Sequence, residues 1–237
     1  FKQGDFRSGY YRDQTFAFAT GMLSMEQWFA GLYAHADLEA EPTSGGRQMG
    51  GHYSTRTVNN DGSWAELTKL NNTSSDISPT ASQMPRLLGL ALASKKYRNT
   101  PELNTPEFEK FSIKGNEVAF GSMGDASTSE GLIWETINAA GVMQVPMLIS
   151  VWDDGYGISV PRKYQTTKGS ITEALKGIQR DKKLDGYEIF KVKGWDYSAL
   201  CETYEKAAEL CRTEHVPVLM HVEEVTQPQG HSTSGSH

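Results

Sequence analysis

Cysteine is scarce in this 237-residue sequence, and this argues against a small fold held together by disulfides. The two cysteines, Cys201 and Cys211, lie in one predicted helix, where ten residues rise by roughly 15 Å, more than a disulfide can bridge. We therefore expect both thiols to be free. Free thiols favour a reducing compartment, which is the cytoplasm of a bacterium or the mitochondrial matrix of a eukaryote.

Long apolar runs and long blocks of one charge are also lacking. No uninterrupted apolar segment approaches the roughly 20 residues that a membrane-spanning helix needs, and the first residues do not follow the pattern of a signal peptide. The formal net charge is −6, from 23 basic and 29 acidic residues in mixed order. This balance argues against broad nucleic-acid binding, whereas an acidic ligand needs only local positive groups.

What the sequence does have is the composition of an ordinary globular domain, with 38% hydrophobic and 22% charged residues. Its length suffices for one large α/β domain. Because the chain begins at Phe1 rather than at Met and ends in a run rich in Ser, His and Gly, we interpret it as part of a longer chain. We expect residues 1–237 to form a single domain, with no second domain in this stretch.

Strand and helix patterns alternate along the second half of the chain. The predicted strands are 117–124, 145–154, 187–194 and 216–225, and the predicted helices are 22–38, 82–98, 127–143, 170–182 and 196–215. Residues 41–78, rich in Gly, Ser, Thr and Asn, are expected to form a long loop, and Asp196 to cap the last helix. Alternation of this kind predicts a mostly parallel sheet between two helical layers, a three-layer α/β/α sandwich.

Two acidic residues follow two of the predicted strands. Asp125 and Asp154 are separated by the 28 residues 126–153, enough for a helical crossover between adjacent parallel strands, so both carboxylates should emerge at one edge of the sheet. Two carboxylates with backbone carbonyls suit Mg²⁺ or Ca²⁺, and Mg²⁺ often shares its ligands with phosphate. Ser127 to Ser129 could open a helix whose free amides face an anion. The alternative is that Asp125 and these serines only cap the helix.

The segments around Asp125 and Asp154 also resemble a motif of a known family. "GDASTSEG" (124–131) and "WDDGYGIS" (152–159) place 26 residues between the triplet 124–126 and the pair Asp153–Asp154. This resembles the thiamine-diphosphate signature, whose usual form is Gly-Asp-Gly, a gap of similar length and Asn-Asn. The longer pattern through "VPMLISVWDDGYGISVP" is similar to the alpha subunit of thiamine-diphosphate-dependent 2-oxo acid dehydrogenases, of the branched-chain or pyruvate type.

Four further stretches resemble that family in the same order, and together the blocks extend over residues 10–234. They are "YYRDQ" (10–14), "GGRQMGGHYS" (45–54), "ISPTASQMP" (77–85) and "GHSTS" (230–234). The resemblance implies that the cofactor is bound by Tyr11, Arg12, Ser78, Thr80, Asp125, Ala126, Ser127, Asp154, Tyr156 and His231. It implies Mg²⁺ on the side chains of Asp125 and Asp154 and the carbonyl of Tyr156. In some members a structural K⁺ lies in the segment that corresponds to 78–83.

The activity that the resemblance implies is oxidative decarboxylation of a 2-oxo acid, with branched-chain substrates favoured over pyruvate. His231 and His52 would be the catalytic histidines, and the acyl group would pass to a lipoyl-bearing acyltransferase. The half that supplies the pyrimidine side of the cofactor site is missing, so we expect a beta subunit or domain in an α₂β₂-like assembly. The alternatives are an acetoin-cleaving or transketolase-like enzyme half and a catalytically silent assembly subunit.

Four residues depart from the family pattern. Ala126 replaces the last glycine of the triplet, which is acceptable if its φ is negative. Asp154 replaces Asn and adds a negative charge beside the diphosphate. Trp152 and Gln227 stand where branched-chain-type members carry arginines. The nearby substitutes for these positive charges are Arg162 and Lys163, whereas His221, within an apolar strand pattern, is expected to be structural.

Overall fold

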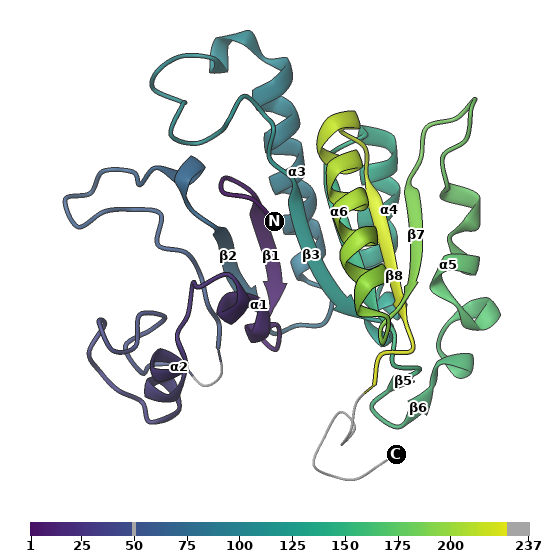
Figure 1. Cartoon of the computed structure of the whole chain (residues 1–237), viewed down its shortest axis with the longest axis horizontal. Helices are drawn as coiled ribbons and strands as arrows, with labels where there is room; N and C mark the ends of the chain where they lie inside the picture. Colours follow the sequence, from purple (N-terminus) through teal and green to yellow (C-terminus); the bar gives the residue numbers. More distant parts are fainter. Residues whose placement is uncertain (49–50, 227–237) are drawn as a thin grey trace.

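A sheet of six parallel strands, in the order β2-β1-β3-β4-β8-β7, forms the centre of the protein (Figure 1). The computed structural model describes residues 1–48 and 51–226. The strands are β1 (Phe6–Tyr10), β2 (Asn72–Ile77), β3 (Ala119–Gly124), β4 (Met147–Trp152), β7 (Glu188–Lys193) and β8 (Val218–Glu223). A separate antiparallel pair, β5 (Tyr156–Gly157) and β6 (Val160–Pro161), follows β4.

Helices cover both faces of this sheet. The α-helices are α1 (Gln14–Ala19), α2 (Met25–Leu32), α3 (Gln83–Asn99), α4 (Gly131–Met143), α5 (Ile171–Ala174) and α6 (Tyr197–Glu214). Helices α3 and α4 pack against one face and α6 against the other (Figure 1). Short 3₁₀ helices span Leu67–Lys69, Pro101–Leu103, Ala126–Ser129, Arg162–Tyr164, Thr167–Gly169 and Lys176–Ile178.

Two apolar cores, one on each face of the sheet, hold the three layers together. Successive residues of β4 point to opposite faces, so Ile149 joins Leu87 and Ile137 in one core while Leu148 joins Cys211 in the other. Such double burial makes the strand a continuous apolar run. The predicted three-layer α/β/α sandwich with a parallel sheet is therefore confirmed.

Two of the six strands were not predicted. Strand β1, FRSGY, lies in a stretch for which no element was predicted, and β2, NTSSDI, lies within the expected loop 41–78. Neither shows an apolar pattern, because both bury polar side chains, among them Arg7, Asn72 and Asp76. A strand whose buried face makes hydrogen bonds rather than apolar contacts carries no hydrophobic signal.

Two predicted helices are shorter than expected. Helix α2 begins at a capping box built by Ser24 and Gln27, but it ends at Leu32 rather than at residue 38, because Ala34 turns into the left-handed region. The helix predicted at 170–182 is reduced to α5, because the backbone around Gln179 bridges to Tyr187 in the manner of a strand.

Two smaller expectations, the cap of the last helix and the free cysteines, are confirmed. The Asp196 side chain accepts a hydrogen bond from the Ala199 amide at 3.0 Å and so caps α6. Cys201 and Cys211 are free thiols, the first exposed and the second buried. Among residues 1–48 and 51–226, no helix is long and apolar enough to cross a bilayer.

Candidate functional site

Asp125 and the Asp153–Asp154 pair leave two neighbouring strands at the same edge of the sheet. Strand β3 pairs with β4 in parallel, with Gly124 opposite Trp152, and the Asp125 amide donates to the Trp152 carbonyl at 3.1 Å. The structure thus brings the three carboxylates to the carboxyl ends of adjacent strands, where ligands bind in parallel sheets.

Asp125 is a buried carboxylate with an unsatisfied oxygen. The residue is 4% exposed, and its Oδ2 atom has no hydrogen-bond partner within the described chain. Burial, followed by the charges of Asp153 and Asp154, raises the pKa of Asp125 to about 7. Its side chain makes no capping hydrogen bond to the 3₁₀ helix that follows.

The carboxylate oxygens fit a divalent cation that shares its ligands with phosphate. An unpaired buried oxygen beside two further carboxylates is stabilised by a cation, and carboxylates are the side chains that Mg²⁺ and Ca²⁺ prefer. Among the residues that the structure describes, no group of three His, Cys, Asp or Glu side chains is arranged to hold a metal alone. Such an ion would therefore complete its shell with backbone carbonyls, water and phosphate oxygens.

Asp153, which the sequence did not single out, is directed into the protein. Its Oδ1 atom accepts from the Gly155 amide at 2.9 Å, and its Oδ2 atom accepts from His221 Nε2 at 2.8 Å and from the Arg162 guanidinium. Burial alone would raise the pKa of Asp153, but the hydrogen bonds from His221 and Arg162 lower it. Asp153 is therefore an ionised internal anchor for the loop after β4.

Asp154 organises the loop itself. Its Oδ1 atom accepts from the Tyr156 amide at 3.0 Å, a local turn that leads into the β5–β6 pair. The Arg162 amide donates to the Gly155 carbonyl at 2.8 Å and closes this hairpin. The backbone of Tyr156, the third predicted metal ligand, is thus held by contacts on both sides.

Ala126, the first departure from the family pattern, is accommodated by a glycine. It lies at the start of a 3₁₀ helix and is not among the residues with positive φ, so the condition set for a methyl group here is met. A Cβ atom added to Gly157 would lie 2.8 Å from the Ala126 Cβ. The missing side chain at Gly157 therefore leaves the room that the Ala126 methyl occupies.

A second group of predicted residues gathers at the ends of β1 and β2. The His52 ring stacks on Tyr11, with centroids 5.7 Å apart and an interplanar angle of 16°, and His52 Nε2 is hydrogen-bonded to Ser78 Oγ. The other ring nitrogen, His52 Nδ1, is buried with no partner in the described part of the chain. Arg12 is exposed, with its guanidinium over the rings of Tyr10 and Tyr11. Thr80 is exposed in the turn before α3.

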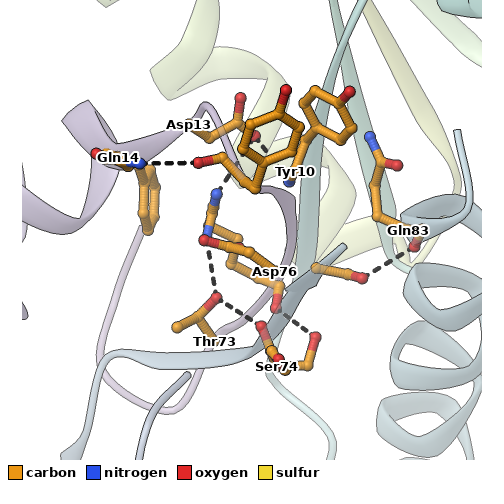
Figure 2. A network of polar contacts seen from close by, with 12 residues as sticks. Tyr10, Asp13, Gln14, Thr73, Ser74, Asp76 and Gln83 are labelled. Carbon is orange, nitrogen blue, oxygen red and sulfur yellow. Dashed lines mark hydrogen bonds and ion pairs between the residues drawn. The ribbon is translucent and has the colours of Figure 1, made fainter. Parts of the chain in front are cut away.

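Beneath this group lies a buried network of charged and polar side chains (Figure 2). Arg7, 1% exposed, donates to Asp76 Oδ1 at 2.7 Å and to Asp13 Oδ2 at 3.3 Å. Burial, opposed by Arg7 and reinforced by Asp13, raises the pKa of Asp76 to about 7. Gln83 donates from Nε2 to the Ser122 carbonyl of β3 at 3.0 Å, so the network reaches across three strands.

The comparison with protein families decides where the chain belongs. A family model described as "Dehydrogenase E1 component" matches residues 1–236. The chain belongs to the dehydrogenase E1 component family. Among its curated relatives is the 2-oxoisovalerate dehydrogenase subunit alpha of Bacillus subtilis (strain 168), 27% identical over 219 residues, which cover 92% of this chain and 54% of the relative.

Other relatives of this E1 component point the same way. The mitochondrial pyruvate dehydrogenase E1 component subunit alpha of Dictyostelium discoideum is 26% identical over 132 residues, 53% of this chain and 30% of the relative. A solved transketolase from Campylobacter jejuni superposes with a TM-score of 0.55 at 13% identity, covering 92% of this chain and 29% of that one, and supports the fold. The chain spans about half the length, 54%, of the Bacillus subtilis relative.

The structure changes the expected role of Arg162 in the E1 component. It was predicted as a substitute for a missing phosphate-binding arginine, but its guanidinium is paired with Asp153. Trp152 is directed toward α6, where its Nε1 atom donates to the Tyr204 hydroxyl at 3.2 Å. The Lys163 ammonium lies 4.9 Å from the centre of the Tyr164 ring. Arg162 thus holds the internal anchor Asp153 in place.

Some predicted residues cannot be placed, and some important ones were missed. His231 and Gln227 lie outside the residues that the structure describes. Asp153 and His221 were missed as a pair, because His221 lies in an apolar strand and its partner follows a different strand. Arg7, Asp13 and Asp76 were missed because β1 and β2 were not recognised as strands. Arg7, a charged residue between Phe6 and the small residues Ser8 and Gly9, was the feature of the sequence that could have drawn attention to this network.

Proposed function

We propose that this chain is the alpha part of a thiamine-diphosphate-dependent 2-oxo acid dehydrogenase, with branched-chain 2-oxo acids favoured over pyruvate as the substrate. The family as a whole depends on thiamine diphosphate. The observation that carries the proposal is the buried Asp125 carboxylate, unsatisfied and beside Asp154, at the carboxyl ends of β3 and β4. A Mg²⁺ ion bound together with a diphosphate would satisfy it.

In this proposal the residues of the chain bind and orient the cofactor. The side chains of Asp125 and Asp154 and the carbonyl of Tyr156 hold Mg²⁺. The amides of Ala126 and Ser127 face the diphosphate, at the start of a 3₁₀ helix that follows β3. When bound, thiamine diphosphate supplies the electron sink for decarboxylation.

The other end of the site provides the remaining contacts in this proposal. Tyr11 and Arg12 approach the diphosphate from the end of β1, where an arginine fork is well suited to phosphate oxygens. Ser78 and Thr80 contact the ring end of the cofactor. A K⁺ ion within residues 78–83 is favoured by the carbonyl oxygen of the Gln83 side chain, which is buried and lacks a hydrogen-bond partner among the described residues.

The two histidines are proposed to act on the substrate and in transfer of the acyl group, and not to bind the metal. His52 holds its Nε2 atom on Ser78 and leaves Nδ1 without a partner in the described chain, so it retains one nitrogen to donate to or accept from a substrate. His231 is proposed to contact the diphosphate and to assist transfer of the acyl group to a lipoyl-bearing acyltransferase. A beta subunit or domain supplies the pyrimidine side, and we expect no activity from this chain alone.

Calorimetric titration tests the cofactor part of this proposal. The full-length protein with its beta partner is titrated with thiamine diphosphate in the presence and absence of Mg²⁺, and Asp125→Ala is the control variant. We expect Mg²⁺-dependent binding that the variant loses. Lack of Mg²⁺-dependent binding by the unaltered complex would contradict the proposal and favour a silent assembly subunit.

A decarboxylation assay tests the substrate part. The reconstituted complex is given pyruvate or 3-methyl-2-oxobutanoate with a lipoyl domain as acceptor, and we expect faster CO₂ release from the branched substrate. Equal rates would remove the branched-chain preference. Turnover of acetoin or a sugar phosphate, with none of either 2-oxo acid, would assign the chain to another class of thiamine-diphosphate enzyme.

A further inference from the structure

Arg7 is a buried charge at the centre of the network described above. Its NH1 atom donates to Asp76 Oδ1 at 2.7 Å and to Thr73 Oγ1 at 3.0 Å, and its NH2 atom lies 3.3 Å from Asp13 Oδ2. The labelled Asp13, Thr73 and Asp76 converge at this point (Figure 2). Because a buried charge is costly unless it is paired and hydrogen-bonded, these four side chains have one favourable arrangement.

The partners of Arg7 lie next to residues proposed to bind the cofactor. Asp13 follows Arg12 directly, and Asp76 precedes Ser78 by two positions. Asp13 Oδ2 also accepts from the Tyr10 amide at 3.2 Å and from the Ser122 hydroxyl on β3. Ser122 lies three residues before Asp125. One guanidinium is therefore connected, directly or through Asp13, to the ends of β1, β2 and β3.

The chain makes room for this guanidinium in a specific way. A Cβ atom at Gly9 would lie 2.0 Å from the Arg7 Cζ atom, so the side chain folds back over a position that only glycine leaves open. On another side the Phe16 ring lies 5.1 Å from the guanidinium, within the range of a cation–π contact. These neighbours leave Arg7 little freedom.

We propose that Arg7 is a positioning residue for the cofactor site. It fixes the separation between the strand ends that carry Arg12, Ser78 and Asp125, and so sets the spacing between the diphosphate contacts and the metal ligands. This inference rests on the proposed function for the ligand, but the ordering of the strand ends is a property of the chain itself. Arg7 does not touch the cofactor.

A second buried ion pair provides a matched control. Arg212 donates from NH1 to Asp5 Oδ1 at 2.8 Å and from NH2 to Asp5 Oδ2 at 2.7 Å, and its side chain is 8% exposed. Asp5 precedes β1 and accepts from the Val118 amide, which precedes β3. The pair thus lies at the amino ends of β1 and β3, whereas the proposed site lies at the carboxyl ends.

The experiment compares Arg7→Met and Arg212→Met in the full-length protein with its beta partner. The melting temperature and the Kd for thiamine diphosphate with Mg²⁺ are measured, the latter well below both melting temperatures. We expect both variants to be less stable and only Arg7→Met to bind the cofactor more weakly, by about 10- to 100-fold. Arg7→Lys, which keeps the charge without the fork, should recover part of the affinity.

Hydrogen exchange separates this inference from the proposed function. In the absence of cofactor, Arg7→Met should exchange faster than the unaltered protein at residues 10–14 and 76–80, and Arg212→Met should not. Equal exchange in these segments for the two variants, or equal changes in Kd, would overturn the positioning role. If the unaltered complex does not bind thiamine diphosphate at all, the proposed function fails, and the exchange rates still decide the role of Arg7.

Discussion

Replacing Asp125 by Asn should stabilise the metal-free protein at neutral pH. Burial, followed by the charges of Asp153 and Asp154, raises the pKa of Asp125 from 3.8 to about 7. The folded state therefore holds a proton on Asp125 that the unfolded state has released, and the contribution of this group to stability falls as the pH rises from about 4 to about 7. A difference of about three pKa units, at about 1.4 kcal/mol each, amounts to about 4 kcal/mol.

The assay is denaturant unfolding of the protein in a chelator between pH 5 and pH 8. The free energy of unfolding of the unaltered protein should fall across this range relative to that of Asp125→Asn, because an amide cannot ionise. Above pH 7 the variant should be the more stable of the two by about 4 kcal/mol. With added Mg²⁺ and thiamine diphosphate, the unaltered protein should instead be the more stable of the two. A bound cation stabilises the Asp125 carboxylate, whereas an amide at this position binds the cation less tightly.

Parallel pH profiles for the two proteins would refute this reasoning. Such a result would mean that the Asp125 carboxylate finds in solution a partner that satisfies its Oδ2 atom without a metal. Asp196→Asn is a suitable control variant, since it also removes one carboxylate charge, on an N-cap far along the chain from the cluster. Its pH profile should follow that of the unaltered protein between pH 5 and pH 8.

Three further substitutions test individual contacts of the site. Gly157→Ala should destabilise the protein by about 1–3 kcal/mol in denaturant unfolding, because its Cβ would meet the Ala126 Cβ at 2.8 Å; an unchanged midpoint would show that the hairpin moves freely. Asp153→Ala should destabilise the protein by about 1–3 kcal/mol, because it leaves the buried His221 ring and the Gly155 amide without their acceptor, and unfolding measured beside Asp154→Ala would show whether the inward carboxylate carries the larger share. His52→Ala, which removes the stack on Tyr11 and the bond to Ser78, should lower the melting temperature only slightly but greatly slow decarboxylation by the full complex; equal losses in both would assign His52 a structural role.

The apolar half of the sheet could be predicted from the sequence, and the polar half could not. Strand β4, MLISVW, is buried on both faces and is therefore recognisable as a continuous apolar run. Strand β2 buries Asn72, Thr73 and Asp76, side chains that are typical of loops when their partners are unknown. The partner of Thr73 and Asp76 is Arg7 on β1, more than sixty residues away in the chain, and this distance hides it from any local pattern.

The same distinction applies to the site. Spacing was enough to bring Asp125 and Asp154 to one edge, because two parallel strands that are joined by a helical crossover end at the same edge of the sheet. It could not show which member of the Asp153–Asp154 pair points inward, since that depends on His221 and Arg162. The order of the family's motifs indicated that Tyr11, His52 and Ser78 belong to one site, and the fold brings these three together.

The inward direction of Asp153 changes the expected effect of the acidic pair on the ligand. Two aspartates in place of two asparagines would add two negative charges beside a diphosphate. One of them, Asp153, is instead paired with Arg162 and His221 inside the protein, and these partners offset its charge. Asp125 and Asp154 together repel a diphosphate unless a cation lies between them and its oxygens. Under the proposed function, thiamine diphosphate should therefore depend more strongly on Mg²⁺ here than in a chain with asparagine at position 154.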